Sequence, residues 1–405
     1  MRAMLQRLTE TAAGLILRFP WVGWVGWIAF CVIALVRVAP HRFNSTFTVY
    51  IDAAKHLLAY RQVYELDSLG GYFYLPIGLL VYAPFTSISP SLAAGFWLAV
   101  FAVVFSWGCY ALMACLLPQG DRGIKAVWLA GVVLLINIPA AWFNFKGVQS
   151  QIVMTGAMLL GAAAIMRAQW PWATFWLFVA IVFKPLALVM ALLCAALCPR
   201  MRLPLIVALA MIAALPFAFF DVAYLVQQYR DFFVKLWLTA AAPPEDWPFR
   251  ADLVTLLQAF GIRPPPLIML TVRALAGLGT LYLAWRVRQT GTLRSFGFAL
   301  LVLSACYINL FTPRNEYLSF VLLTPSLAAL AMLVLARDGG DWRGWLLVFA
   351  ALVLGMWWSL AIDAVLKPAI VVVIYGWLAW LMARPERWRA LADAGDGSIK
   401  LQPVH

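Results

Sequence analysis

The sequence predicts an all-α polytopic membrane protein, and three observations lead to this fold class. Of the 405 residues, 65% are hydrophobic and only 12% are charged, whereas soluble domains are about 45–50% apolar and about 25% charged. Apolar segments long enough to cross a bilayer recur along the whole chain. Basic residues gather in alternate connections between these segments, as expected for a chain that crosses a membrane back and forth.

A spanning helix needs roughly 20 mostly apolar residues. Segment 171–198 is too long for one span and contains Lys184-Pro185 near its middle, where proline removes a backbone donor, so we predict two shorter helices that meet there. We expect about 10–13 transmembrane helices in total. The other predicted spans are 20–39, 90–117, 126–144, 150–168, 203–220, 265–287, 295–311, 318–336, 344–361 and 367–384.

The basic residues predict that both termini lie on the inner side of the membrane. Residues 1–19 are expected to form a cytoplasmic amphipathic lead into a signal-anchor helix, and 385–405 a polar cytoplasmic tail. A single transmembrane domain covers 20–384, with long outer loops at 40–89 and 221–264. The net charge of +13 is therefore mostly a topology signal, and nucleic acid is not expected as a partner.

The first outer loop is unusually polar for so hydrophobic a chain. Residues 50–60 have a helical pattern that places Asp52 and His56 on one face, opposite Ile51, Ala54, Leu57 and Leu58. We predict a short helix on the outer membrane surface. The stretch "GGYFYLPIGLLVYAPF" at 70–85 predicts a turn and a second interfacial helix.

Short outer loops also carry cations, against the positive-inside tendency. Lys146 and Arg314 lie in the brief outer connections 145–149 and 312–317. A phosphate-bearing ligand is one physical reason to keep positive charge there. The six cysteines lie in apolar segments without metal-ligand spacing, so neither a metal site nor a cofactor is expected.

Several motifs, in order, resemble glycosyltransferase family 87, whose members have the GT-C fold. "TFTVYIDAAKHLLAYRQVYEL" and "FYLPIGLLVYAPF" are similar to the family's first outer loop, "FKGVQSQIVM" to its Gly-Gln-x-Asn segment, and "VFKPLALVM" to a Lys-x-x-Pro-type helix start. "NLFTPRNEYLSFVLLTP" is similar to its late outer loop. The likeness extends over about 45–335, although Thr46 stands where the family has an acidic residue.

The resemblance implies an enzyme that transfers a sugar from a polyprenyl-phosphate donor to a glycan or glycolipid acceptor. Its site would lie on the periplasmic face of a bacterial inner membrane, in contact with lipid and without a metal. Such chemistry needs a base for the acceptor hydroxyl and cations for the phosphate. The expected base is Asp52, with Glu316 second and Asp67 third. The expected phosphate ligands are Arg314, Lys146 and Lys184. The sugar hydroxyls would be bound by Gln149, Gln151 and Asn315, and the ring of Tyr74 would stack on the sugar or on the prenyl chain.

Simpler interpretations stay open for these residues. Asp52 could pair with Lys55 or His56 on an exposed helix, Arg314 and Glu316 could form a structural salt bridge, and Lys184 could snorkel or pair. Two other functions are also compatible with many spans. One is a transporter or flippase of a lipid-linked or anionic substrate, and the other is a surface-glycan polymerase or ligase. The acid-rich first outer loop favours glycosyl transfer over transport.

Overall fold

The computed structural model describes residues 21–38, 45–118, 123–242, 246, 249–313, 315–337 and 341–392. Over these residues the chain is helical, and its one β contact is an isolated antiparallel bridge between Arg250 and Glu316. The predicted all-α class is therefore confirmed. Six helices are long and apolar enough to cross a membrane, and one bent pair makes a possible seventh.

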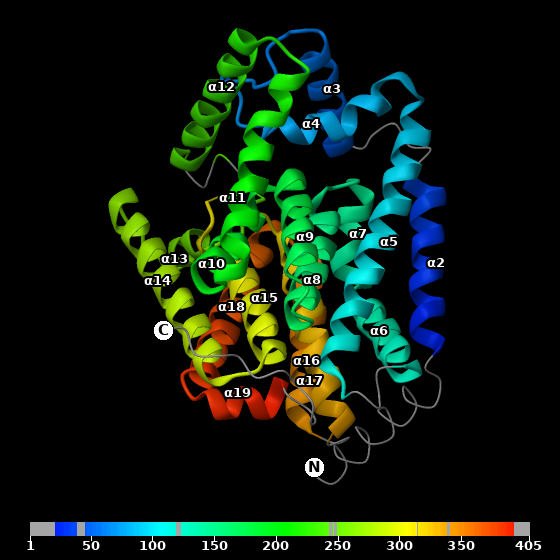
Figure 1. Ribbon diagram of the computed structural model, residues 1–405, viewed down its shortest axis with the longest axis vertical. Coiled ribbons are helices and arrows are strands. Elements are labelled where there is room, and N and C mark those ends of the chain that lie inside the picture. The colour runs from blue at the N-terminus through cyan, green and yellow to red at the C-terminus, as the bar shows by residue number, and fades with distance from the viewer. Residues whose placement is uncertain are drawn as a thin grey trace.

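The helices form a bundle with a cap at one end, as Figure 1 shows. α2 and α14 lie at opposite edges of the bundle, α19 (Pro385–Ala392) lies across the end away from the cap, and the shorter α8 and α9 lie at its centre. The long apolar helices are α2 (Trp21–Val38), α5 (Pro90–Leu116), α11 (Pro199–Ala214) with the 3-10 turn η4 (Leu215–Ala218), α14 (Pro266–Thr290), α15 (Leu293–Phe311) and α18 (Leu360–Met382). The shorter ones are α8 (Gln151–Met166), α9 (Trp170–Phe183), α10 (Leu188–Leu197), α16 (Thr324–Arg337) and α17 (Trp342–Gly355).

The helix break predicted at Lys184-Pro185 is present. α9 ends at Phe183, Lys184 has an extended backbone with φ −150° and ψ 121°, and Pro185 starts the 3-10 turn η3 (Pro185–Ala187) before α10. The residue before a proline disfavours helical dihedrals, and proline itself has no N–H to donate. This local rule places the Lys184 side chain at an interruption between two helices.

A second break was not predicted. Segment 126–144, expected as one span, is divided into α6 (Ile124–Ile136) and α7 (Ile138–Lys146), which are bent by 62°. Asn137 lies between them; its side-chain amide donates to the carbonyl of Val133 at 2.7 Å, and its side-chain oxygen accepts from the hydroxyl of Thr324 at 2.6 Å. The bend is thus held by a residue 187 positions away.

The cap consists of helices from both long loops. α3 (Ser45–Leu58), α4 (Pro76–Tyr82) and the 3-10 turn η1 (Ala83–Ser87) lie where short helices are predicted in the first loop. α12 (Val222–Ala241) and α13 (Leu253–Ala259) come from the 221–264 loop. In Figure 1, α3, α4 and α12 share the upper end of the molecule.

α12 holds the first loop through backbone contacts. The Tyr224 hydroxyl donates to the carbonyl of Arg61 at 2.7 Å, and the Gln228 side chain accepts from the N–H of Val63 at 3.1 Å. The fully buried ammonium of Lys235 donates to the carbonyls of Glu65 and Ser68. These contacts tie residues 61–68 to one helix, so the two loops form a single structure.

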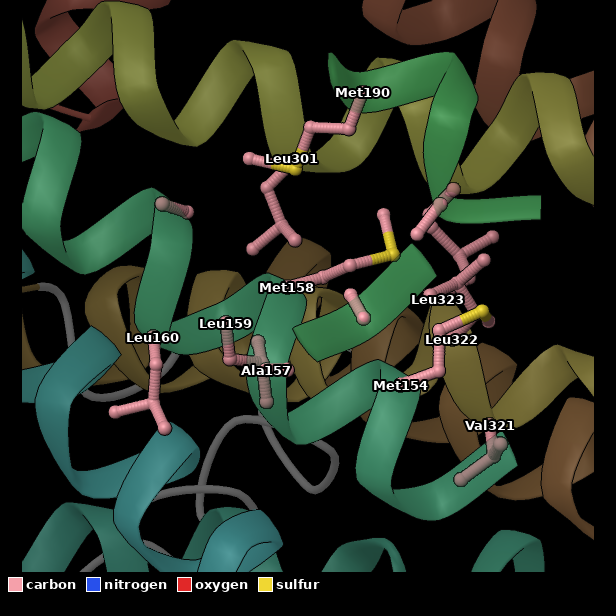
Figure 2. Packing of buried hydrophobic residues seen from close by; sticks show 14 of the residues in the cluster. Met154, Ala157, Met158, Leu159, Leu160, Met190, Leu301, Val321, Leu322 and Leu323 are labelled. Carbon is pink, nitrogen blue, oxygen red and sulfur yellow. The ribbon is translucent and has the colours of Figure 1, made fainter. Parts of the chain in front are cut away.

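The apolar core is centred on α8, all sixteen residues of which are buried. Met154 and Met158 of α8 lie in one cluster with Met190, Leu301 and Leu322, as seen in Figure 2. α8 also approaches α5 closely at small residues. A Cβ added to Gly156 would lie 2.8 Å from the carbonyl oxygen of Val104. Backbones this close leave no room for a side chain.

We expect Gly156→Ala to destabilise the protein by about 1–3 kcal/mol, because the new methyl group overpacks a backbone contact. The measurement is the thermal unfolding midpoint of the purified protein in detergent. Gly279→Ala is the matched control, since a Cβ there meets no atom within 4 Å. A midpoint for Gly156→Ala equal to that of Gly279→Ala would contradict the close α5–α8 contact.

Lys235→Met is expected to loosen the cap, because it removes the donor of two part-buried carbonyls, and a net hydrogen bond contributes about 0.5–1.5 kcal/mol. Amide hydrogen exchange over 61–70 should accelerate while exchange in α8 is unchanged. Arg230→Met removes an exposed charge from the same helix and serves as the control. Equal protection of 61–70 in both variants would show that Lys235 does not hold this loop.

Candidate functional site

The centre of the candidate site is the buried cation of Lys184, which is 6% exposed. Its ammonium donates to the side-chain oxygen of Gln151 at 2.6 Å and lies 5.6 Å from the centre of the Tyr74 ring. No ion pair joins Lys184 to a carboxylate in the part of the chain that the structure describes. The structure thus brings three of the predicted site residues into contact around one uncompensated charge.

Gln151 supplies donors as well as an acceptor. It is the first residue of α8 and is fully buried, and its side-chain N–H₂ has no hydrogen-bond partner within the described residues. The turn before it contains Val148 at φ 44°, which is unusual for a β-branched residue. Such strained backbone is found where a fold must hold a side chain in place, and here it delivers Ser150 and Gln151 to the site.

Tyrosine rings form one wall of the site. The hydroxyl of Tyr50, on α3, lies 3.4 Å from the hydroxyl of Ser150, and its ring centre lies 5.8 Å from that of Tyr74. Burial raises the pKa of Tyr50 and the pKa of Tyr74 above the ordinary tyrosine value. Both groups therefore keep their protons at neutral pH and act as hydroxyl donors rather than as bases.

Glu316 is the predicted acid that lies half-buried in the late outer loop. Burial raises the pKa of Tyr74, and the negative charge of Glu316 adds to this shift. Its loop is fixed by backbone pairing: the N–H of Ala251 donates to the carbonyl of Asn315 at 2.7 Å, and the N–H of Tyr317 donates to the carbonyl of Phe249 at 3.1 Å. The two outer loops therefore position the acid together.

Asn315 is held by the same pairing. Its side-chain amide donates to the carbonyl of Ala251 at 3.1 Å and to the side chain of Asn309 at 3.3 Å, while its side-chain oxygen is buried without a partner among the described residues. Gln149 is also buried, two residues before Gln151. Of the three predicted sugar ligands, Gln151 contacts Lys184, Gln149 precedes it by two residues, and Asn315 is fixed in the late outer loop. Arg314 lies outside the described residues.

The first predicted acid, Asp52, is placed differently. It is exposed and pairs with Lys55 at 3.1 Å, as its simpler interpretation expects. Asp52 follows Tyr50 by two residues, about 200° around the helix, and Tyr50 is the residue that reaches the site. Lys146 and Asp67 are also exposed. The structure does not bring these three charges to Lys184.

A buried ion pair near the late outer loop was missed at the sequence level. Asp363, predicted in an outer connection, lies in the first turn of α18, 3.5 Å from Lys367, and both are about 1% exposed. Lys367 also donates to the carbonyl of Tyr317 at 3.3 Å, next to Glu316. An acid and a lysine four residues apart in an apolar run is a signal that could have found this pair.

A second buried pair supports the other side of that loop. The Arg250 guanidinium lies 2.6 Å from the Asp252 carboxylate, and Asp252 caps α13. Burial raises the pKa of Asp252, while the positive charges of Arg250 and Arg273 oppose that shift. The charge of Arg273, on α14, thus acts on Asp252 as well.

Among the residues that the structure describes, no three His, Cys, Asp or Glu side chains are grouped closely enough to hold a metal ion. No protein-family model matches this sequence, and no curated protein matches it significantly. The properties of the site therefore rest on the residues themselves.

Lys367→Met should destabilise the protein by about 3–5 kcal/mol, because it leaves the buried Asp363 carboxylate without its cation. The double variant Asp363→Leu with Lys367→Met should recover most of this loss, since both charges are then absent. Thermal unfolding midpoints in detergent give the comparison. If the double variant is as unstable as Lys367→Met alone, the pair is not what the single substitution breaks.

Proposed function

We propose that this protein is an integral-membrane glycosyltransferase of the GT-C type, which transfers a sugar from a polyprenyl-phosphate donor to a glycan or glycolipid acceptor. The observation that carries the proposal is the buried ammonium of Lys184, whose described partners are a neutral amide and an aromatic ring. A buried charge without a counter-ion is costly, and an anionic ligand would remove that cost. A donor phosphate supplies such an anion.

The groups around Lys184 fit a phosphate. An ammonium has three N–H donors, and Gln151 accepts from one of them. The unpartnered N–H₂ of Gln151 and the hydroxyls of Tyr50 and Ser150 add neutral donors beside it. Preorganised donors of this kind stabilise the charge that develops on a departing phosphate.

In the proposed reaction, the acceptor hydroxyl oxygen attacks the anomeric carbon of the donor sugar. The bond between that carbon and the phosphate oxygen breaks, and its electron pair leaves with the polyprenyl phosphate, held by Lys184 and Gln151. Glu316 takes the proton from the acceptor hydroxyl. We assign this role to Glu316 in preference to Asp52, because the charge of Glu316 acts on Tyr74 whereas Asp52 lies on the exposed face of α3.

The proposed setting follows from the predicted topology. The site lies at the cap end of the bundle, which the basic residues predict to be the periplasmic side of a bacterial inner membrane. The shorter apolar helices would complete a bundle of about 10–13 spanning or partly spanning helices. No cofactor is assigned to the reaction.

A transporter or flippase of an anionic lipid-linked substrate is the second candidate. The observation in its favour is the presence of two interrupted helices, at Asn137 and at Lys184-Pro185, because transporters often bind substrates at broken helices. The Thr324 hydroxyl bonded to Asn137 fixes the first interruption. A rigid break agrees better with a catalytic site than with a gate.

The test is sugar transfer from a panel of radiolabelled polyprenyl-phosphate sugars in membranes that contain matched amounts of each variant. Glu316→Gln should lower the rate by about 10²–10⁴-fold by removing the base. Lys184→Met should lower it by about 10²–10³-fold by removing phosphate stabilisation. Asp52→Asn should stay near the wild-type rate.

Arg230→Met is the matched control for Lys184→Met, because it also replaces a cation with an apolar side chain but at an exposed position. Loss of activity in Asp52→Asn with activity kept in Glu316→Gln would reverse the base assignment. Absence of transfer from every donor, together with uptake of a lipid-linked sugar into proteoliposomes, would favour the transporter.

A further inference from the structure

A second polar feature lies at the end of α8 away from the cap. A pocket of about 160 Å³ opens there between α5, α8 and α9. At about 30 Å³ per water molecule, this space could hold about five waters. We call it the tryptophan groove. Its lining includes Trp107, Ala111, Arg167, Trp172 and Trp176.

The groove lies beside the last turns of α5 and α8. The Cys115 thiol of α5 donates to the carbonyl of Ala163 on α8 at 3.5 Å, so the two helices end at about the same level. Arg167 caps α8 there and lines the same pocket as Ala111, which lies further back along α5. Side chains on a helix lean toward its N-terminus, so the Arg167 side chain lies along the groove.

The Arg167 side chain is exposed and makes no hydrogen bond or ion pair with the described residues. Other arginines at this end are bonded: Arg202 donates to the carbonyls of Ala195 and Ala196, and Arg286 donates to that of Ala383. The next residue, Ala168, has φ 57°, so the chain turns sharply into α9. A guanidinium that has no partner among the described residues is satisfied by an anion or by water.

The walls of the groove are indole rings. Trp107 and Trp172 are 50% and 56% exposed, and the rings of Trp107 and Trp176 meet edge to face with their centres 5.2 Å apart. Indoles favour the depth at which the hydrocarbon core meets the headgroups. The groove thus combines apolar sides suited to acyl chains with one planar cation suited to a phosphate.

We propose that the tryptophan groove binds an anionic phospholipid of the inner leaflet, with its phosphate on Arg167 and its acyl chains against the indoles. A soluble phosphate fits less well, because it would leave the indole rings of Trp107, Trp172 and Trp176 uncovered. This inference does not depend on the proposed glycosyl transfer, since the groove lies at the other end of α8 from Lys184.

The test is a titration of the full-length protein in detergent with phosphatidylglycerol, followed by native mass spectrometry. Arg167→Ala and Arg167→Gln should each weaken binding by about tenfold or more, because charge-assisted hydrogen bonds to the phosphate are lost. Phosphatidylcholine should bind wild type and variants equally. Arg343→Ala is the matched control, because it removes an exposed arginine from the same predicted side, away from the groove.

Three results would overturn the proposal. Arg167→Ala could bind phosphatidylglycerol as tightly as the wild type, or Arg343→Ala could lose as much affinity as Arg167→Ala, which would indicate a diffuse charge effect. Displacement of the lipid by millimolar glycerol 3-phosphate would identify a soluble anion as the ligand instead. Because Arg167 is exposed, its substitution leaves the core intact, and the unfolding midpoint checks this.

Discussion

The length of α8 is the constraint on which the arrangement of polar groups depends. Its sixteen residues span about 24 Å, whereas the hydrocarbon core of a bilayer is about 30 Å thick. Every residue of α8 is buried among other helices, so neither end can shift toward water without breaking the core. At the end away from the cap, the Cys115 thiol donates to the carbonyl of Ala163, so α8 ends level with α5. The shortfall therefore lies at the cap end, where it leaves Gln151 and its partner Lys184 at membrane depth.

The cap covers the polar residues at the end of α8 near Lys184. Loops that follow the surface would leave Lys184 and Gln151 facing lipid, so residues 50–74 and 315–317 must fold inward to cover them. Unsupported loops would not hold that position, because ordering each residue costs about 1–2 kcal/mol of conformational entropy. The backbone bonds from Lys235 to the first loop, and the pairing of Ala251 with Asn315, provide the compensating contacts.

Features encoded by local rules could be predicted from the sequence, whereas those set by distant contacts could not. Composition alone predicts the all-α membrane class, and Pro185 predicts the break after Lys184. The bend at Asn137 has a local signal in Pro139, which was overlooked, whereas the bond from Thr324 to Asn137 is a distant contact that no local pattern shows. The pattern of α3 correctly places Asp52 opposite the buried face, but it does not say that the buried face, with Tyr50, meets the site. Asp363 and Lys367 were missed because the predicted helix boundary at 367 separates them.

The buried lysines show why Lys184 is best regarded as a ligand-binding residue. Within the described residues three lysines are buried, and each ammonium has different polar partners. Lys367 has a carboxylate four residues away, and Lys235 has two backbone carbonyls that fix a loop. Both have a structural explanation. Lys184 has only one amide oxygen and one ring as described partners. An apolar side chain such as methionine would need no counter-charge at this position. A fold that keeps such a charge, and places the unpaired side-chain N–H₂ of Gln151 beside it, supports the proposal that Lys184 binds the phosphate of a donor.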